Sequence, residues 1–405
     1  MLRFRAFLAF RQFSALAGCP VAQSPNDLPK DLAESNAFPI LSARRSIMAN
    51  LPATLGYRMP AEWEPHEATW IAWPHERTDW PGKFAAIPWV FAEIVRHLHQ
   101  CEQVNILVND EDHETLATKV LRNADINWNR ICLWRIATDR GWMRDCGPIF
   151  VTNPKGKLGL TNWRFNGWAK YANWKRDNAV PNRLAKKLKL PSWEPRSGSR
   201  PIVLEGGSID VNGQGLLLTT EECLLSPVQQ RNPGLERADL ERAFADYLGI
   251  RKVLWLGQGI VGDDTHGHVD DLTRFVGPGK VVTVIEDDPQ DANYRPLHEN
   301  LDRLQSMTDL DGRRLEVVSL PMPAPLFFAQ QRLPASYANF YIANDKVLVP
   351  TYNDPKDRLA LGTLADLFPE RKVVGIHAVD LVLGLGTLHC LTQQQPLRIQ
   401  SAKKR

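Results

Sequence analysis

The sequence is short of cysteine and has no long apolar run, and both shortages exclude classes of protein. Its six cysteines, at positions 19, 101, 132, 146, 223 and 390, form no CxxC pair and follow no regular spacing. That pattern argues against a zinc ribbon or a disulfide scaffold and favours a reducing compartment. The apolar stretches near the N-terminus are too short and too broken to cross a membrane. We therefore expect a cytoplasmic protein that is not bound to a membrane.

A strong excess of one charge is also missing. The formal net charge is +3, and residues 1–50 account for all of it with six basic and three acidic side chains. Residues 51–405 are formally neutral and contain no basic stripe interleaved with aromatic residues, so we expect no nucleic-acid partner. A content of 43% hydrophobic and 23% charged residues is typical of a soluble globular protein.

The N-terminal segment differs from the rest of the chain. Its first 26 residues contain three arginines and no acidic residue. Such a composition is typical of an organellar transit peptide, and also of upstream sequence translated from an incorrect start. We expect residues 1–50 to be a disordered leader or a mis-assigned start, and we favour initiation near Met48. Residues 51–400 are then a single domain, followed by a basic tail at 401–405.

Hairpin signals recur along the chain at a fixed distance. Residues 208–219, 273–285 and 339–351 each read as two strands around a tight turn, and the turns at 212, 278 and 344 are evenly spaced. Each hairpin is followed by a helical pattern and another strand, at 235–248 and 252–256, at 294–307 and 314–320, and at 358–368 and 372–376.

The earlier part of the chain fits the same scheme. A hairpin is expected at 148–163 with a helix at 181–190, and before it strands at 68–72, 104–108 and 131–136 with helices at 87–100 and 112–122. Four or five ββαβ units at a common period predict a radial or solenoid array. The alternative is an ordinary α/β topology with coincidental spacing.

Polar clusters lie at the ends of these units and predict a shared pocket. They are GWMRDCGP (141–148), LEGGSID (204–210), GDDTHGHVDD (262–271) and GLGTLHC (384–390). In a radial array such ends converge on the central axis, where a pocket can form.

The last cluster carries the candidate nucleophile. An apolar strand pattern at 381–383 runs into a turn with two glycines, which would present the thiol of Cys390 at a strand end. The alternative is that Cys390 fills space in the core, since free cysteines are among the most buried residues.

The cluster at 263–271 is too dense for a routine surface loop. It holds four carboxylates and two imidazoles in nine residues, as an acid–base site would require. Strand alternation would place His268 and Asp270 on one face. A zinc site is a remote alternative, because THGHVDD approaches the H-x-H-x-D-H signature of binuclear zinc hydrolases. Asp271 stands where that signature needs a histidine, and the later histidines are too few and poorly placed to complete two sites.

Two further acids stand beside glycines. Asp145 follows an arginine and precedes a Gly-Pro turn, and Glu205 follows an apolar strand and precedes two glycines. Either acid can bind a ligand cation, and either can equally be a solvated turn or ion-pair residue.

Taken in order, the motifs resemble those of the agmatine deiminase branch of the guanidine-modifying, or pentein, superfamily. The resemblance runs from about residue 57 to residue 396. It is carried by MPAEWEPHEATWIAWPH (59–75), GWMRDCGP, LEGGSIDVNGQG, TEECLL (220–225), RNPG (231–234), THGHVDD, ASYANFYIAN (335–344) and LHCLTQQQP. It implies a five-bladed α/β propeller with a central funnel, in agreement with the repeats.

The resemblance also implies the roles of six residues. Cys390 matches the nucleophile and His268 the general acid/base, with Glu205 supporting His268 and the guanidinium. Asp145 and Asp270 match the carboxylates that grip the guanidinium, and Trp142 matches an aromatic beside the substrate. No cofactor is implied. The chain departs from the family pattern at His266 and Asp271, which replace asparagines, and at Gly-Leu-Gly-Thr-Leu-His-Cys, where a glycine triplet and Asn-Ile-His-Cys are usual.

The implied reaction is hydrolysis of agmatine to N-carbamoylputrescine and ammonia through a cysteine thiouronium. A deiminase of peptidyl or free arginine is the alternative within the superfamily, with Arg164, Arg176 and Arg231 as candidates to bind the extra carboxylate. A third possibility, a catalytically inactive scaffold, does not explain why all these polar residues are present. The protein is expected to act on a small guanidinium molecule, and a homodimer is possible.

Overall fold

The computed structural model describes residues 50–398, so the expected leader, apart from Asn50, and the tail at 401–405 lie outside the described residues. Four three-stranded sheets repeat one pattern, in which an antiparallel hairpin is followed by a helix and a third, parallel strand. The strands are β4 (Ile149–Thr152), β5 (Leu158–Thr161) and β6 (Ser192–Trp193); β9 (Asp210–Val211), β10 (Leu216–Thr220) and β11 (Lys252–Leu256); β12 (Thr273–Gly277), β13 (Lys280–Ile285) and β14 (Glu316–Pro321); β17 (Tyr341–Ile342), β18 (Lys346–Thr351) and β19 (Lys372–His377).

A fifth sheet joins the two ends of the described chain. Its order is β20 (Gln393–Pro396), β1 (His66–Ala72), β2 (Gln103–Val108) and β3 (Ile131–Arg135). The first pair is antiparallel and the others are parallel, so the C-terminal strand supplies the hairpin partner that the first unit lacks. Two small hairpins complete the strands, β7 (Arg196–Ser197) with β8 (Arg200–Pro201) and β15 (Phe327–Phe328) with β16 (Gln331–Arg332).

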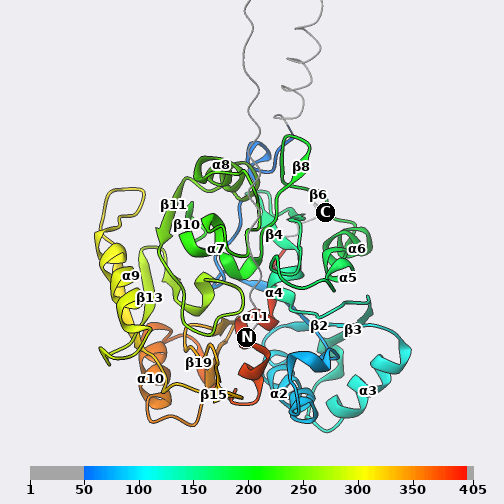
Figure 1. Ribbon diagram of the computed structural model, residues 1–405. Helices are drawn as coiled ribbons and strands as arrows, with labels where there is room; N and C mark the ends of the chain where they lie inside the picture. The colour runs from blue at the N-terminus through cyan, green and yellow to red at the C-terminus, as the bar shows by residue number, and fades with distance from the viewer. Residues whose placement is uncertain (1–49, 399–405) are drawn as a thin grey trace, which may run out of the picture. The chain divides into compact units, whose positions relative to one another are not determined.

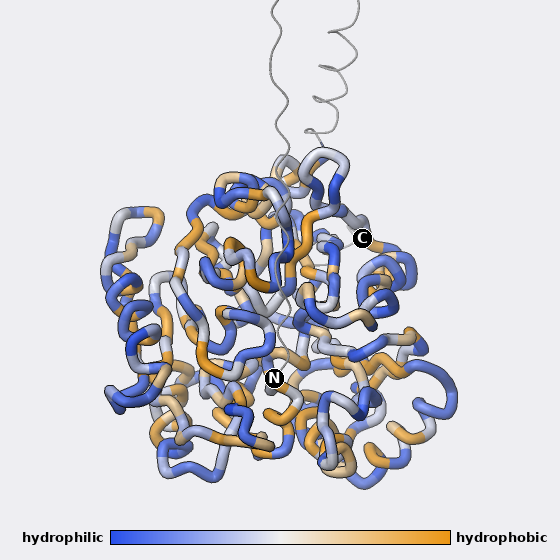
Figure 2. The backbone as a smooth tube through the Cα atoms, viewed as in Figure 1, coloured by the Kyte–Doolittle hydropathy of each residue, from blue (hydrophilic) through white to orange (hydrophobic). Residues whose placement is uncertain are grey.

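The longer helices lie outside the sheets (Figure 1). They are α2 (Ile87–Leu98), α3 (Glu111–Leu121), α6 (Val180–Leu188), α8 (Arg237–Leu248), α9 (Tyr294–Ser306) and α10 (Asp357–Leu367). Each turns an apolar stripe inward and polar residues outward, so Figure 2 shows hydrophobic strands beside largely hydrophilic outer helices. Strands covered in this way read as apolar runs such as KVVTVI in β13. Within residues 50–398 no helix is long and apolar enough to cross a membrane.

Short helices carry the polar clusters toward the middle of the view. These are α4 (Met143–Cys146), α7 (Glu221–Leu225) and α11 (Leu388–Leu391), together with the 3-10 turns η5 (Gly206–Ser208), η6 (Val269–Asp271) and η7 (Leu381–Gly384), whereas α5 (Lys175–Asn178) lies beside α6 at the outside in Figure 1. Helices α4 and α11 lie inside the ring of outer helices in Figure 1.

Hydrogen bonds join successive units, and each of them links two residues that are one repeat apart in the sequence. The Asn212 amide donates to the carbonyl of Pro278 at 2.7 Å, and the Arg274 guanidinium donates to the carbonyl of Phe340 at 2.7 Å. Both pairs are 66 residues apart, which is the spacing of the predicted turns. The repeat in the sequence therefore corresponds to neighbouring units in space.

The predicted hairpins, helices and third strands are confirmed, with ends that differ by a few residues. The strand expected at 381–383 is wrong, because Leu381–Gly384 is the 3-10 turn η7. This segment pairs with no other strand, and its carbonyl at Leu381 accepts the indole N–H of Trp80 instead. Its apolar side chains reflect burial, which a short run shares with buried strands.

Candidate active site

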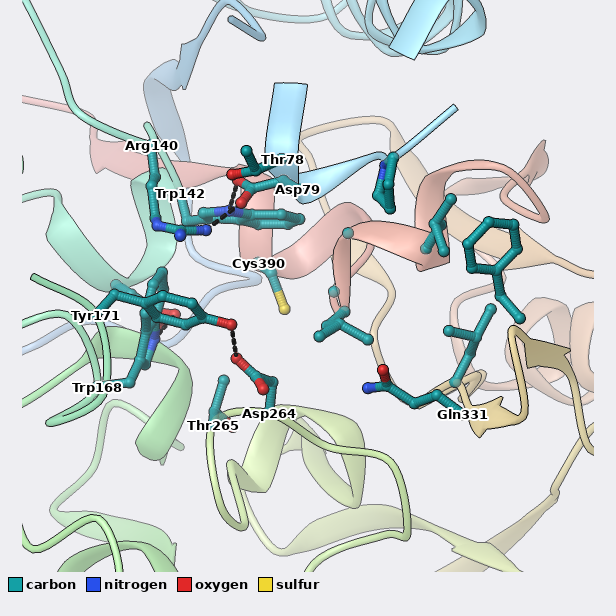
Figure 3. Close-up of a pocket in the computed structure, with 18 residues that line it drawn as sticks. Thr78, Asp79, Arg140, Trp142, Trp168, Tyr171, Asp264, Thr265, Gln331 and Cys390 are labelled. Atoms are coloured by element: carbon teal, nitrogen blue, oxygen red, sulfur yellow. Dashed lines mark hydrogen bonds and ion pairs between the residues drawn. The ribbon is translucent and has the colours of Figure 1, made fainter. Parts of the chain in front are cut away.

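Cys390 points into a cavity of about 270 Å³ (Figure 3), and Asp145 also lines this cavity. Trp142 covers one side of the sulfur, while Tyr171, Asp264 and Thr265 form the opposite wall. The remaining wall is formed by residues of η7 and of the β15–β16 hairpin: Phe328, Gln331, Leu333, Leu383, Gly384, Leu385 and Gly386. The cavity is small and closed on several sides, as suits a small molecule.

Asn339 holds the turn that carries the nucleophile. Its side-chain carbonyl accepts from the hydroxyl of Thr387 at 2.8 Å and from the backbone N–H of His389 and Cys390 at 3.1 and 3.4 Å. Its amide donates to the sulfur of Cys390 at 3.1 Å and to Asp271 at 2.9 Å. One buried side chain thus sets both the start of α11 and the position of the thiol. The sequence interpretation quoted this residue in a motif but gave it no role.

The thiol of Cys390 is surrounded by acids. Its sulfur lies 3.7 Å from Oδ2 of Asp270. Burial, together with the charges of Asp270, Asp271 and Asp145, raises the pKa of Cys390 well above its usual value. In this environment the thiol keeps its proton until a cation enters.

Asp145 is the carboxylate that faces the cavity directly. The backbone N–H of Gly207 donates to its Oδ1 at 3.0 Å, and the indole of Trp168 donates to its Oδ2 at 2.9 Å. Burial and two neighbouring carboxylates outweigh these hydrogen bonds and raise the pKa of Asp145 to about 6. A cation bound beside Asp145 would favour its ionised form.

His268 is fully buried behind Asp145 and is surrounded by three carboxylates. Its Nδ1 lies 3.8 Å from Asp145 and 4.0 Å from Asp270, and its Nε2 lies 3.8 Å from Glu205. Burial alone would lower the pKa of His268, but the charge of Asp145, followed by the contacts with Cys223 and Glu205, raises it well above its ordinary value. The ring is therefore a proton donor at neutral pH.

His268 and Asp270 face the same side, as predicted, but not through strand alternation. Residues 269–271 form the 3-10 turn η6, with His268 at its start. The loop before it is held by Asp263, whose carboxylate accepts the N–H groups of Thr265, Gly267 and His268 at 2.7 to 3.1 Å. The turn, rather than a pleat, brings the two side chains together.

The zinc alternative requires His266 and His268 to bind the same metal ion, but the surroundings of the two side chains differ. His266 contacts Ser226 at 3.1 Å and Glu222 at 3.8 Å, whereas His268 contacts Asp145, Asp270 and Glu205. Within residues 50–398 two other sets combine metal-ligating groups within 4.8 Å, namely Glu205, Cys223 and His268, and Asp270, Asp271 and Cys390. Neither set uses His266, so the H-x-H signature does not form one binding site.

Glu205 forms a buried ion pair that the sequence interpretation missed. Its Oε1 accepts from Nε of Arg231 at 3.1 Å, and both side chains are inaccessible. Burial opposes ionisation, but the charges of Arg231 and His268 outweigh it and lower the pKa of Glu205 to about 2. The proposal that Arg231 binds a substrate carboxylate at the funnel mouth is therefore wrong. Arg164 and Arg176 do not line the cavity either, and both are exposed.

Four buried atoms in this group have no hydrogen-bond partner among residues 50–398. They are both ring nitrogens of His268, Oε2 of Glu205 and Oδ1 of Asp270. Buried polar atoms without partners are costly and rare. Gly207 lies beside these atoms, and only glycine fits there. A methyl group at this position would lie 2.5 Å from Nδ1 of His268 and 2.8 Å from Oδ1 of Asp145. The two carboxylate oxygens among these atoms can accept from a small cation with several N–H donors, while the protonated ring of His268 can donate.

The outer cavity contains charges that are already paired. Asp79 accepts from the indole of Trp142 at 3.0 Å and pairs with Arg140, whose guanidinium lies 3.8 Å from the ring centre of Tyr171. Asp264 on the other wall accepts from the hydroxyl of Tyr171 at 2.7 Å and pairs with Lys170. Of the six predicted site residues, Trp142, Asp145 and Cys390 line the cavity, and His268, Asp270 and Glu205 are buried behind them. The sequence interpretation gave no role to the residues of the outer wall.

The chain is similar in sequence and in structure to known deiminases. The family model described as Porphyromonas-type peptidyl-arginine deiminase matches residues 58–396. An agmatine deiminase of Pseudomonas aeruginosa is 37% identical over 368 residues, which cover 85% of this chain and 97% of the relative. The solved agmatine deiminase of Enterococcus faecalis is 35% identical with a TM-score of 0.79, over 86% of this chain and 98% of that one. That of C. jejuni with substrate bound is 28% identical with a TM-score of 0.75, over 85% and 97%.

Proposed function

The chain belongs to the Porphyromonas-type peptidyl-arginine deiminase family, and we propose that it hydrolyses agmatine to N-carbamoylputrescine and ammonia. One observation carries this proposal. A thiol, an imidazolium and three carboxylates lie together, and two of the carboxylate oxygens, Oε2 of Glu205 and Oδ1 of Asp270, have no hydrogen-bond partner among the described residues. A guanidinium is a planar cation with five N–H donors, so it matches both the negative charge and the free acceptors of these carboxylates.

Substrate binding is assigned to Asp145 and Asp270. Two carboxylates on different elements, α4 and η6, hold the guanidinium by charge-assisted hydrogen bonds and fix its plane. Trp142 covers the cavity side, held by Asp79 and stacked on Trp80 with ring centres 5.5 Å apart. The bound cation also stabilises the thiolate, which counters the acids that raise the pKa of Cys390.

The chemistry proceeds in two stages. The thiolate of Cys390 attacks the guanidinium carbon and forms a C–S bond and a tetrahedral adduct. The His268 imidazolium gives its proton to one amino group, which leaves as ammonia as the C–N bond breaks, and a covalent S-alkylthiouronium remains. Neutral His268 then removes a proton from water, whose oxygen attacks the same carbon. The C–S bond breaks as the remaining hydroxyl proton of the resulting adduct passes to the departing sulfur, so the ureido product is released and the thiol, which lost its proton to solvent when the substrate bound, is regenerated.

The outer cavity favours agmatine over arginine. Arg140 is the one lysine or arginine that lines the cavity within residues 50–398, and Asp79 already pairs with it. The carboxylate of free arginine or of a C-terminal arginine would have to be desolvated there without an unpaired cation. Agmatine carries no carboxylate and avoids this cost.

We also propose that the five sheets are the blades of a propeller around this site. Hydrogen bonds already described join the β9–β11 sheet to the β12–β14 sheet, and the latter to the β17–β19 sheet. Similar contacts join the remaining sheets. The backbone N–H of His66 donates to the side chain of Asn344 at 2.8 Å, and the amide of Gln393 donates to the carbonyl of Pro148 at 2.9 Å. Ile149 and Leu217 share one apolar cluster and join the remaining two sheets. Five such contacts are what a closed ring of five units requires.

The remaining proposals concern the organisation of the protein. Residues 51–400 are proposed as a single catalytic domain in a cytoplasmic enzyme that needs no cofactor. A homodimer is proposed because closed two-fold assemblies are the commonest oligomers. Analytical ultracentrifugation of the full chain would test this, and a monomer at micromolar concentration would contradict it.

The function is tested by ammonia release from agmatine, free arginine and a peptide ending in arginine. We expect turnover of agmatine alone, and none by Cys390→Ser, which keeps the size of the side chain but lacks the thiolate. Intact mass spectrometry of enzyme quenched during turnover should detect the thiouronium adduct on Cys390. Faster turnover of arginine or of the peptide would contradict the substrate, and activity of Cys390→Ser would contradict the covalent route.

A further inference from the structure

His389, directly before the nucleophile, contacts two carboxylates through its two ring nitrogens. Nδ1 lies 2.6 Å from Oδ2 of Asp270, and Nε2 lies 2.8 Å from Oε2 of Glu62. The ring is buried. A ring nitrogen bonds to an ionised carboxylate only by donating an N–H. If both acids are ionised, His389 carries two protons and a positive charge.

The surroundings of Glu62 require it to be ionised. Its Oε2 accepts from Arg144 at 3.0 Å, and its Oε1 accepts from Arg274 and from the backbone N–H of Ile342, both at 2.9 Å. Burial opposes ionisation, but these cations and His389 keep the pKa of Glu62 well below its usual value. Glu62 therefore has no proton to donate to His389.

Asp270 is ionised for a similar reason. Burial raises its pKa, but the hydrogen bond with His389 and the charges of His389, His268 and Arg274 outweigh burial and lower it. The contact uses Oδ2 of Asp270 and leaves Oδ1 without a partner among the described residues, 4.0 Å from Nδ1 of His268. The same Oδ2 lies 3.7 Å from the sulfur of Cys390. His389 thus determines which oxygen of Asp270 remains free.

The contacts of His389 are themselves rigidly held. Arg144 donates to the backbone carbonyl of His389 at 3.3 Å and to the side chain of Gln394 at 2.7 Å. Arg274 also pairs with Asp210 at 3.4 Å. The acid on each side of the ring therefore belongs to an ion network that is anchored on several elements, and the ring cannot turn without breaking two short contacts.

We propose that His389 is a positioning residue, an imidazolium that donates to both carboxylates and holds Asp270 with its free oxygen turned to the substrate guanidinium. This inference rests on the proposed function only in assigning the substrate to Asp270. It predicts that the Nδ1 contact matters for catalysis and that the Nε2 contact matters mainly for stability. A residue that merely fills the core would show no such division.

The two nitrogens can be tested separately by substitution. His389→Asn places an amide donor near the position of Nδ1, so it can still reach Asp270, whereas His389→Gln places the donor near Nε2, toward Glu62. We expect His389→Gln to lower kcat/KM about 100-fold and His389→Asn about 10-fold, in line with the loss of groups that orient a binding residue. The loss should include KM, because Asp270 binds the substrate. Equal losses, or a larger loss in His389→Asn, would overturn the proposal.

A double-mutant cycle separates positioning from general damage. In the Asp270→Asn background, adding His389→Gln should lower kcat/KM by less than about 3-fold, because the residue that His389 positions is already altered. A full additional loss there would overturn the proposal. His99→Asn is the matched control, since His99 is buried at the end of α2 and contacts the backbone of Asn127 at 3.4 Å, away from the cavity. We expect it to change the melting temperature without changing KM.

A spectroscopic measurement on the wild type complements the kinetics. Nitrogen-15 NMR of histidine-labelled wild-type protein, under the conditions of the activity assay, should show two protonated ring nitrogens for His389, assigned by their absence in whichever His389 variant is folded. A neutral ring would overturn the proposal. Wild type without agmatine turnover would instead refute the proposed function, and the kinetic cycle could then be repeated on the guanidinium compound that is turned over.

Discussion

A methyl group on Gly207 would lie 2.5 Å from Nδ1 of His268. The same group would lie 2.8 Å from Asp145 and 3.1 Å from Asp270, while the backbone N–H of Gly207 donates to Asp145 at 3.0 Å. A single residue without a side chain thus makes room for the acid–base residue and for both guanidinium carboxylates.

Gly207→Ala should therefore remove activity by displacing these three side chains. We expect kcat/KM to fall by at least about 100-fold, since a displacement of about 1 Å in a reacting group costs that much. Gly279→Ala is the matched control, because a methyl group in that hairpin turn meets no atom within 4 Å. Steady-state kinetics and circular dichroism of both variants check the prediction. Normal activity of a folded Gly207→Ala would contradict the crowding described here.

The pKa of Asp145 predicts an acidic limit to catalysis. A carboxyl group with a pKa of about 6 is an anion above that pH and loses its charge as the pH falls through 6. Guanidinium binding should weaken below pH 6, and kcat/KM should then fall toward tenfold per pH unit. A profile of kcat/KM between pH 4.5 and 8 measures this decrease on the acidic side. In Asp145→Asn the decrease should be absent, and the variant should also lose most of its affinity for agmatine.

The buried ion pair of Arg231 predicts a loss of stability when Arg231 is replaced, although Arg231 does not line the cavity. Arg231→Met removes the partner of a fully buried Glu205 and should cost about 3–5 kcal/mol of unfolding free energy. It should also raise the pKa of Glu205 from about 2, because the main charge that lowers it is lost. Arg164→Met is the control, since Arg164 is exposed and should change stability by no more than about 1 kcal/mol. Urea unfolding of both variants is the measurement, and similar losses would contradict the assignment.

Asn339 allows the environment of the thiol to be changed by one charge. Asn339→Asp keeps an acceptor for Thr387 and for the N–H groups of α11, but places a negative charge about where the amide lies, 3.1 Å from the sulfur. The pKa of Cys390 should rise further, so kcat should fall about 10-fold or more. The optimum should move to higher pH. An unchanged pH optimum would show that a charge at position 339 does not affect the pKa of the Cys390 thiol.

Much of the fold was predictable from local chemistry. The Asn-Gly, Pro-Gly and Asn-Asp pairs predicted three hairpins, and strand and helix periodicity predicted the elements after them. The segment at 381–383 was mispredicted because a short apolar run has the same composition in a buried turn as in a buried strand. His268 and Asp270 were expected to share a face for a reason that does not hold, since a 3-10 turn brings them together.

By itself, the amino-acid sequence determined the repeat, the hairpins and the identity of the polar residues at the unit ends, because turn chemistry and periodicity act over a few residues. Only the tertiary structure decided the partners of those residues. His389 meets Glu62 across 327 positions, and Cys390 meets Asp270 across 120. Arg231, expected at the cavity mouth, is buried against Glu205. The protonation of each group depends on burial and on charges from distant segments, and these are properties of the folded chain.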